Sequence, residues 1–329
     1  MKKLFVSLLI CGSLIGCKSS TTSSPRGDSE NNVNTEVAPV EKVSTSQLED
    51  IVHYLSADEL MGRNTGTDGI EASAVFIENE LKNYGIKPYF ETYRDAFTVR
   101  ETSAYNIVGF IEGNDPKLKN EIVIIGAHYD HIGFGKKVEG DSIANGANDN
   151  ATGTSAVLTI AKHLSLLKTN KRSVMVALFS AEEMGLLGSK HLANKLKAEN
   201  INLYTVVNIE MIGVPFKDRD YTAFLTGYDH SNMASQINDY VGYNLIGSSE
   251  VAKKYNLFRA SDNYPFYDVF KLPSHTISSC DLSNYDYYHH VGDEANKQDY
   301  EHMASLVNKL IPAIETICKT PTKEIILNE

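Results

Sequence analysis

The stretch RSVMVALF (residues 172–179), followed by SAEEMGLLGS (residues 180–189), is an apolar run that ends in two adjacent carboxylates. Such a run is typical of a parallel strand that is covered on both faces. Two neighbouring carboxylates beside a core repel each other, and the pKa of one of them rises. A cation bound by one carboxylate, with the other left to carry protons, would resolve this conflict. An ordinary helix start, which also favours acids, is the alternative for the pair alone.

The composition indicates a globular protein and argues against a nucleic-acid partner. The chain has 329 residues, of which 42% are hydrophobic and 22% are charged. These proportions are typical of globular domains. The net charge of −11 argues against a nucleic-acid partner, because nothing would offset the repulsion by phosphate groups.

The N-terminus has the pattern of an export signal. Lys2 and Lys3 precede an apolar segment, residues 4–15, that is too short to span a bilayer. The segment ends at Cys17 in a sequence that resembles the bacterial lipobox. We therefore expect a lipoprotein signal peptide at residues 1–16 and a flexible tether at residues 17–45, which is rich in small polar residues. The chain would then be lipid-anchored through Cys17 in the cell envelope, at an outer membrane; a plain signal peptide is the alternative.

Apolar periodicity predicts one globular domain over residues 46–319. Strands alternate with helices, which favours a central mixed, mainly parallel β-sheet flanked by helices on both faces. The predicted helices cover residues 69–84, 151–167, 186–196 and 300–318, and the predicted strands cover residues 121–127, 174–179, 203–209, 221–225 and 275–278.

Other parts of the chain give weaker patterns. A capping box at Ser46 predicts the start of the first helix. The segment 85–120 is expected to be irregular, and residues 320–329 are expected to form a loose tail. Cys280 and Cys318 could form a disulfide in an oxidising compartment, and the sequence leaves this pairing open.

Four further motifs carry side chains suited to metal chemistry, and most of them follow an apolar run. GAHYDH (residues 126–131) offers His128 as a zinc ligand, and Asp130 could hold its other ring nitrogen. NGANDNATG (residues 145–153) offers Asp149, which could bridge two cations or simply form an Asx turn or helix cap. NIEMIG (residues 208–213) places Glu210 at a strand end, and YHHVGD (residues 288–293) adds a second imidazole.

These side chains together fit a site for two metal ions. Sites in parallel sheets lie beyond the carboxyl ends of the strands, where the motifs fall. Two histidines and three carboxylates suit two zinc ions that share an aspartate, and one carboxylate is left over. Two such ions clamp and activate a water while they polarise a carbonyl group. The leftover carboxylate could serve as general base and acid.

In this order the five motifs resemble the M28 family of co-catalytic zinc peptidases, which are mainly aminopeptidases. SADELMGRNTG (residues 56–66) and SDNYPF (residues 261–266) also look like family stretches, and the likeness covers roughly residues 46–318. Each motif alone is weak, whereas five in the right order are specific. The resemblance implies a zinc exopeptidase-like fold, two Zn²⁺ ions per chain and peptide substrates.

The resemblance also implies a role for each matching residue. One zinc ion would be held by His128, Asp149 and Glu210, and the other by Asp149, Glu183 and His289. Glu182 would be the general base, and Asp130 would orient His128.

The resemblance further sets some residues apart. His289 is preferred to His290 because its spacing to Asp293 matches the family pattern; His290 and His131 are expected not to be ligands.

The chain departs from the family pattern at three positions. Glu210 stands where the family usually has Asp, Asn148 where an acid is common, and Asn263 where a His is common. The predicted activity is metal-dependent hydrolysis of peptides from the N-terminus. Carboxypeptidase and dipeptidase action stay open. A single-zinc glutaminyl cyclase and a binding lipoprotein without turnover are the alternative functions.

Overall fold

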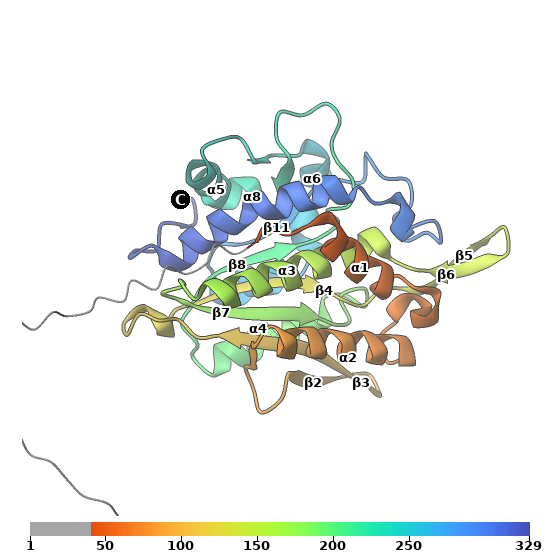
Figure 1. The fold of residues 1–329 in the computed structure, drawn as a ribbon, viewed down its shortest axis with the longest axis horizontal. Coiled ribbons are helices and arrows are strands. Elements are labelled where there is room, and N and C mark those ends of the chain that lie inside the picture. The colour runs from red at the N-terminus through yellow and green to blue at the C-terminus, as the bar shows by residue number, and fades with distance from the viewer. Residues whose placement is uncertain (1–40) are drawn as a thin grey trace, which may run out of the picture. The chain divides into compact units, whose positions relative to one another are not determined.

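A large mixed sheet runs through the part of the chain that the computed structural model describes, residues 41–329 (Figure 1). Its strands lie in the order β1-β3-β7-β4-β8-β11-β9-β10, and β2 also pairs with β3. The strand bounds are β1 (Lys87–Pro88), β2 (Arg94–Val99), β3 (Thr102–Ile111), β4 (Ile122–His128), β7 (Ser173–Phe179), β8 (Leu203–Ile209), β9 (Ala223–Leu225), β10 (Ile246–Gly247) and β11 (Ser274–Ser278). A separate hairpin consists of β5 (Gly133–Val138) and β6 (Asp141–Ala144).

The centre of the sheet is parallel, as its apolar strands predict. β4 lies between β7 and β8, and its Ile125 is opposite Val176 of β7 and Val207 of β8. Every residue of these three strands is buried. β11 continues the parallel set beside β8, whereas β3 runs antiparallel to β7 and β9 runs antiparallel to β11. The predicted fold, a mixed sheet with a parallel centre, is therefore confirmed.

Helices cover both faces of this sheet. Val123 and Ile125 of β4 pack into the core under α1, α2, α3, α5 and α8, while Ile122 and Ile124 pack against α4 and α7 on the other face. Figure 1 shows α1, α3 and α8 lying across the same face. The helix bounds are α1 (Thr45–Leu55), α2 (Asp68–Asn83), α3 (Thr152–Leu167), α4 (Leu187–Ala198), α5 (Met233–Val241), α6 (Glu250–Lys254), α7 (Asn263–Phe270) and α8 (Tyr300–Lys319).

The segment 85–120 differs from the expectation of irregular chain, because it contains β1, β2 and β3. β2 and β3 form a hairpin along one side of the sheet, and both strands mix exposed and buried residues. Asn106 of β3 is fully buried and donates a hydrogen bond to Asp95 of β2 at 3.0 Å. Polar side chains of this kind dilute the apolar pattern, so the strands are weak in the sequence.

Both ends of the described chain also differ from expectation. The N-cap of α1 is Ser44 and not Ser46 as expected. Ser44 forms a capping box with Gln47. Residues 320–329 were expected to be loose, yet Ile325 is buried and its amide donates to the hydroxyl of Tyr204 at 2.9 Å. Leu327 forms a β-bridge further along the same segment. The tail is held by partners far away in the sequence, which no local pattern could indicate.

Other predictions concern the N-terminus and the cysteines. The signal peptide, Cys17 and nearly all of the tether lie outside the described residues, and these predictions stay predictions. Within residues 41–329, no helix is long and apolar enough to cross a membrane. Cys280 and Cys318 are both buried, free thiols.

Arg172, which directly precedes β7, connects that strand to the start of β4 and to the end of α8. Its side chain is fully buried, and its Nε donates to Glu121 Oε2 at 2.7 Å at the start of β4. Its Nη1 donates to the carbonyl groups of Ile317 and Thr320 at the end of α8, at 3.0 and 2.6 Å. A cation is favourable at a helix C-terminus, where carbonyl groups lack partners. The Arg172 guanidinium therefore fixes the last helix to the parallel strands.

We expect Arg172→Ala to lower the free energy of unfolding by about 3 kcal/mol, because the partly buried Glu121 carboxylate and the helix carbonyl groups lose their donor. Denaturant melts monitored by circular dichroism would measure this loss. Lys171→Ala removes the neighbouring positive charge and should change stability by less than about 0.5 kcal/mol. If both variants lost the same free energy of unfolding, the loss of one positive charge, and not the loss of the buried hydrogen bonds of Arg172, would explain the effect.

Candidate metal centre

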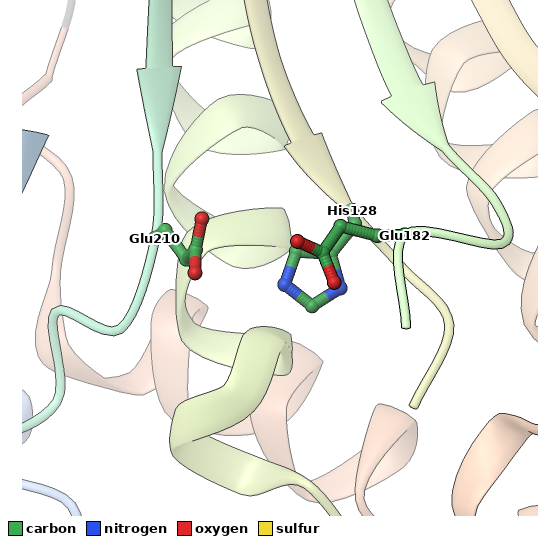
Figure 2. Close-up of side chains that lie close together, drawn as sticks. All are labelled: His128, Glu182 and Glu210. Carbon is green, nitrogen blue, oxygen red and sulfur yellow. The ribbon is translucent and has the colours of Figure 1, made fainter. Parts of the chain in front are cut away.

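The carboxyl ends of β4, β7 and β8 bring candidate ligands to one edge of the sheet. His128 is the last residue of β4, Glu182 and Glu183 follow β7, and Glu210 directly follows β8. Because the three strands are parallel neighbours, these ends meet at the same edge. Figure 2 shows the side chains of His128, Glu182 and Glu210 directed into one space beyond the strands.

His128, Glu182 and Glu210 form the first candidate metal group. One ligand atom from each of them lies within 4.8 Å of the others. The His128 ring is buried, with Nδ1 3.2 Å from the main-chain oxygen of Asp130 and Nε2 3.3 Å from Asp149 Oδ1. Zinc-binding histidines commonly donate one ring N–H to a carbonyl or carboxylate and bind the metal with the other nitrogen. The geometry of His128 allows metal binding through Nε2.

Asp149, Glu183 and His289 form a second group next to the first. His289 Nε2 lies 3.3 Å from Asp149 Oδ2 and 3.0 Å from Glu183 Oε2. The two oxygens of Asp149 thus face different imidazoles, Oδ1 facing His128 and Oδ2 facing His289. The Nε2 atoms of both histidines are buried and make no hydrogen bond among residues 41–329. Two unpartnered imidazole nitrogens that face a shared carboxylate fit a pair of metal ions.

Asp130 takes a different role from the one expected. Its carboxylate is 3.8 Å from His128 Nδ1, beyond hydrogen-bond distance, and the nearer atom is its own main-chain oxygen. The carboxylate instead accepts the backbone N–H groups of Glu182 at 3.1 Å and Glu183 at 3.3 Å. Those two amides lie in a sharp turn after β7, in which Ala181 has a φ of +55°. No neighbouring strand of the described chain offers the two N–H groups an acceptor there. Asp130 therefore orients the glutamate pair.

A second carboxylate holds the loop that carries Asp149. Asp293 Oδ1 accepts the N–H of Asn148 at 2.7 Å, and Oδ2 accepts the N–H of Asp149 at 3.0 Å. The His290 ring turns away from the cluster, since its Nδ1 accepts the N–H of Gly292 at 2.9 Å. Of the two adjacent histidines, His289 is the one that the structure brings to Asp149 and Glu183.

Several residues at the site were not assigned a place from the sequence. His131 was expected not to be a ligand, and the structure places its Nδ1 2.9 Å from Glu183 Oε1 and 3.7 Å from Asp149 Oδ2. Ser261 donates a hydrogen bond to Glu210 Oε2, and the neighbouring Asp262 is fully buried. The SDNYPF stretch that contains both residues was the available signal. The signal for His131 was its position at the end of the first motif.

The positions that depart from the family pattern have structural partners. Asn148 Oδ1 accepts the N–H of Gly213 at 2.9 Å, which ties the Asp149 loop to the loop after β8. Asn263 is fully buried, and it donates to the carbonyl group of Ser274 at 3.2 Å and accepts from Thr276 Oγ1 at 2.8 Å. These contacts fix loops around the site.

Burial controls the protonation of the cluster. Desolvation raises the pKa of Glu210 to about 7 and the pKa of Asp130 to about 6, and it raises the pKa of Glu182 well above its usual range. Burial alone would lower the pKa of His289, but the carboxylates of Asp149 and Glu183 raise it to about 10. Protons or metal cations are needed to neutralise so many buried acids.

Comparison with known proteins agrees with this geometry. The model of Peptidase family M28 matches residues 106–312, more than half of the chain. Leupeptin-inactivating enzyme 1 of Streptomyces exfoliatus is 32% identical over 177 residues, which are 53% of this chain and 36% of that protein. Leucine aminopeptidase 2 of Trichophyton rubrum is 30% identical over 188 residues, 56% of this chain and 31% of that protein. The chain thus spans about a third of the length of these curated relatives.

Solved structures share the fold. A zinc aminopeptidase from Bacillus subtilis superposes with a TM-score of 0.67 at 15% identity, covering 85% of this chain and 97% of that one. Porphyromonas gingivalis glutaminyl cyclase superposes with a TM-score of 0.65 at 15% identity, covering 84% of this chain and 99% of that one. At such identities the likeness concerns the fold. The match of the family model, over the segment that carries every candidate ligand, shows that the chain belongs to Peptidase family M28.

Proposed function

We propose that this chain is a zinc-dependent aminopeptidase that removes N-terminal residues from peptides. Membership of Peptidase family M28 supports peptide hydrolysis. The single observation that carries the proposal is the position of Asp149, whose two carboxylate oxygens lie 3.3 Å from two different histidines. A carboxylate in that position is suited to bridge two metal ions, which is the arrangement needed to activate a water beside a peptide carbonyl group.

The proposed site holds two zinc ions. His128, Asp149 and Glu210 would hold one ion, and Asp149, Glu183 and His289 would hold the other. Zinc accepts imidazole and carboxylate ligands of this kind. Glu210 is one methylene longer than the usual aspartate, and Ser261 supports it by donating a hydrogen bond to Oε2. This hydrogen bond limits the freedom that the longer side chain would otherwise have.

Glu182 is the proposed general base. Bound zinc ions would polarise the peptide carbonyl group and make a water nucleophilic at neutral pH. Glu182 lies beside His128 and Glu210, and burial raises its pKa, so its carboxylate is suited to take up a proton. It would receive a proton from the attacking water and pass it to the amine that leaves. The Asp130 carboxylate, bound to the Glu182 N–H, keeps that side chain at its place in the turn.

A cavity next to Glu210 is the proposed site for the first side chain of the substrate. Its wall includes Ser261, which contacts the Glu210 carboxylate, and Tyr288, whose ring stacks on His289 with centroids 3.9 Å apart. The larger apolar side chains that line it are Met211, Phe224, Leu257 and Leu282. A cavity of mixed apolar and hydroxyl-bearing side chains beside acidic groups suits a peptide with an apolar first residue and a protonated α-amine.

Glu182→Gln should lower kcat by about 10²- to 10⁴-fold while both zinc ions stay bound, because the amide cannot carry the proton but fills the same space. Steady-state kinetics and metal analysis of the purified protein would measure the two effects. Glu199→Gln, an exposed glutamate at the end of α4, is the matched control and should be fully active. Wild-type activity of Glu182→Gln would remove Glu182 from the mechanism.

A peptide screen tests the proposed substrate. We expect cleavage of peptides with a free N-terminus and no cleavage of their N-acetylated forms, because the acidic site favours a protonated amine. A first residue of Leu or Met should give a kcat/KM roughly 10- to 100-fold higher than Asp or Lys, since the cavity would bury an apolar side chain. A chelator should abolish the activity and added zinc should restore it. Cleavage of the acetylated peptides at equal rates would contradict aminopeptidase action.

In chelator-treated protein, the free energy of unfolding should fall as the pH rises from about 5 to 8. The native state keeps a proton on Glu210 up to a pKa of about 7, against 4.5 ordinarily, and on His289 up to about 10, against 6.5. The unfolded chain releases these protons at lower pH, so the native state loses its advantage in this window. Urea melts at each pH would measure the decline, which saturating zinc should reduce because zinc displaces these protons. A flat profile without zinc would contradict this account of the buried cluster.

A further inference from the structure

His131 is a buried histidine at the site that the proposed ligands and general base do not use. It lies between β4 and β5, its side chain is fully buried, and its Nδ1 is 2.9 Å from Glu183 Oε1. The other carboxylate oxygen of Glu183, Oε2, is 3.0 Å from His289 Nε2. Glu183 is therefore held between two imidazoles, one at each oxygen. His131 contacts Oε1, whereas the contact with the proposed ligand His289 is made by Oε2.

We propose that His131 is a positioning residue for the second metal site: its Nδ1–H group donates a hydrogen bond to Glu183 Oε1, which leaves Oε2 to face the metal beside His289. This inference rests on the proposed function. A carboxylate that is held at one oxygen is restricted in rotation, and the free oxygen then has one preferred direction. Hydrogen bonds from neighbouring groups to metal-binding carboxylates tune metal affinity in this way.

The surroundings of the other ring nitrogen decide how the ring is protonated. His131 Nε2 is buried and has no hydrogen-bond partner among residues 41–329. A buried N–H group without an acceptor is costly and rare, whereas a buried acceptor without a donor is tolerated more often. The proton of the neutral ring therefore belongs on Nδ1, next to the Glu183 carboxylate. With that proton in place, Nδ1 is a donor and has no lone pair for a metal.

The backbone around His131 holds the ring in this orientation. Gly146, in the loop before Asp149, has a φ of +59°, and a Cβ atom at this position would lie 2.5 Å from Cγ and Cδ2 of His131. Only glycine leaves this space for the ring. Arg63 fixes the same loop by donating to the carbonyl group of Gly146 at 2.8 Å, and its own carbonyl group accepts the N–H of His131 at 3.3 Å. The ring is thus packed closely against the loop that presents Asp149.

The competing possibility is that His131 is itself a metal ligand. Ligand atoms of His131, Asp149 and Glu183 lie within 4.8 Å of one another, so distance alone permits it. The two roles differ in what can replace the imidazole. A hydrogen-bond donor can be replaced by an amide, because the Asn Nδ2 group occupies nearly the same position as His Nδ1. A zinc ligand cannot be replaced in this way, because zinc sites in proteins use Cys, His, Asp and Glu.

The test compares His131→Leu with His131→Asn. Leu keeps much of the volume of the ring but has no donor, whereas Asn restores a donor. Zinc titration of chelator-treated protein against a chromophoric chelator gives the two dissociation constants. His131→Leu should raise the dissociation constant of the second zinc ion by about 10- to 100-fold and change that of the first by no more than a few fold. His131→Asn should recover most of the lost affinity. His163→Ala, which removes a half-buried imidazole from α3, is the control and should bind both ions like the wild type.

Each other outcome overturns the inference. Wild-type zinc affinity in His131→Leu would show that the hydrogen bond has no part in metal binding. Equal weakening in His131→Leu and His131→Asn would identify His131 as a ligand. Circular dichroism of both variants without zinc checks folding; if the Leu variant does not fold, the Asn variant still decides between donor and ligand. A wild-type protein that binds fewer than two zinc ions would overturn the proposed two-metal site itself, so the two failures are distinguishable.

Discussion

The carboxylates that gather at the carboxyl edge of the parallel strands are the constraint on which the rest of the site depends. Buried anions are unfavourable unless hydrogen bonds, protons or cations compensate them. The structure supplies all three kinds of compensation in one place. Backbone amides donate to Asp130, burial raises the pKa of Glu182 and of Glu210 and so favours their protonated forms, and two imidazoles face Asp149. A fully buried guanidinium, that of Arg63, adds positive charge behind the cluster.

The loops around this edge are fixed to one another by hydrogen bonds. Asp293 binds the backbone of the Asp149 loop, Asn148 binds the loop after β8, and Ser261 binds Glu210. These contacts cross between segments that follow different strands. A ligand site that is preorganised in this way needs little rearrangement when a metal binds. The same network explains why Asn can stand at position 148, where its carbonyl oxygen has a definite structural partner.

The sequence predicts the centre of the fold better than its periphery. β4, β7 and β8 are mostly apolar segments that are buried on both faces, so their existence could be predicted from the apolar pattern and their parallel arrangement from the alternation of strands with helices. The hairpin of β2 and β3 and the C-terminal tail were missed, because exposed and polar residues interrupt the former and long-range contacts hold the latter.

At the site, too, residues in local motifs could be predicted, whereas contacts between distant segments could not. His128, Asp149, Glu183, Glu210 and His289 could be named because each lies in a short motif, and the structure brings them together. The contacts of His131 and Asp130 could not be predicted. They depend on the path of the turn after β7, and spacing along the chain does not encode that path.

The candidate ligands come from five separate segments: the β4 end, the Asp149 loop, the turn after β7, the turn after β8, and the loop before α8. These segments are far apart along the chain. No short fragment contains enough of them to capture an ion. The metal site therefore depends on contacts between residues that are distant in the sequence. Bringing these residues together costs conformational entropy, and this cost is offset only when the parallel strands and the last helix have packed together. Ion uptake should therefore come late in folding and report completion of the whole domain, which differs from zinc modules that fold around an ion from a disordered peptide.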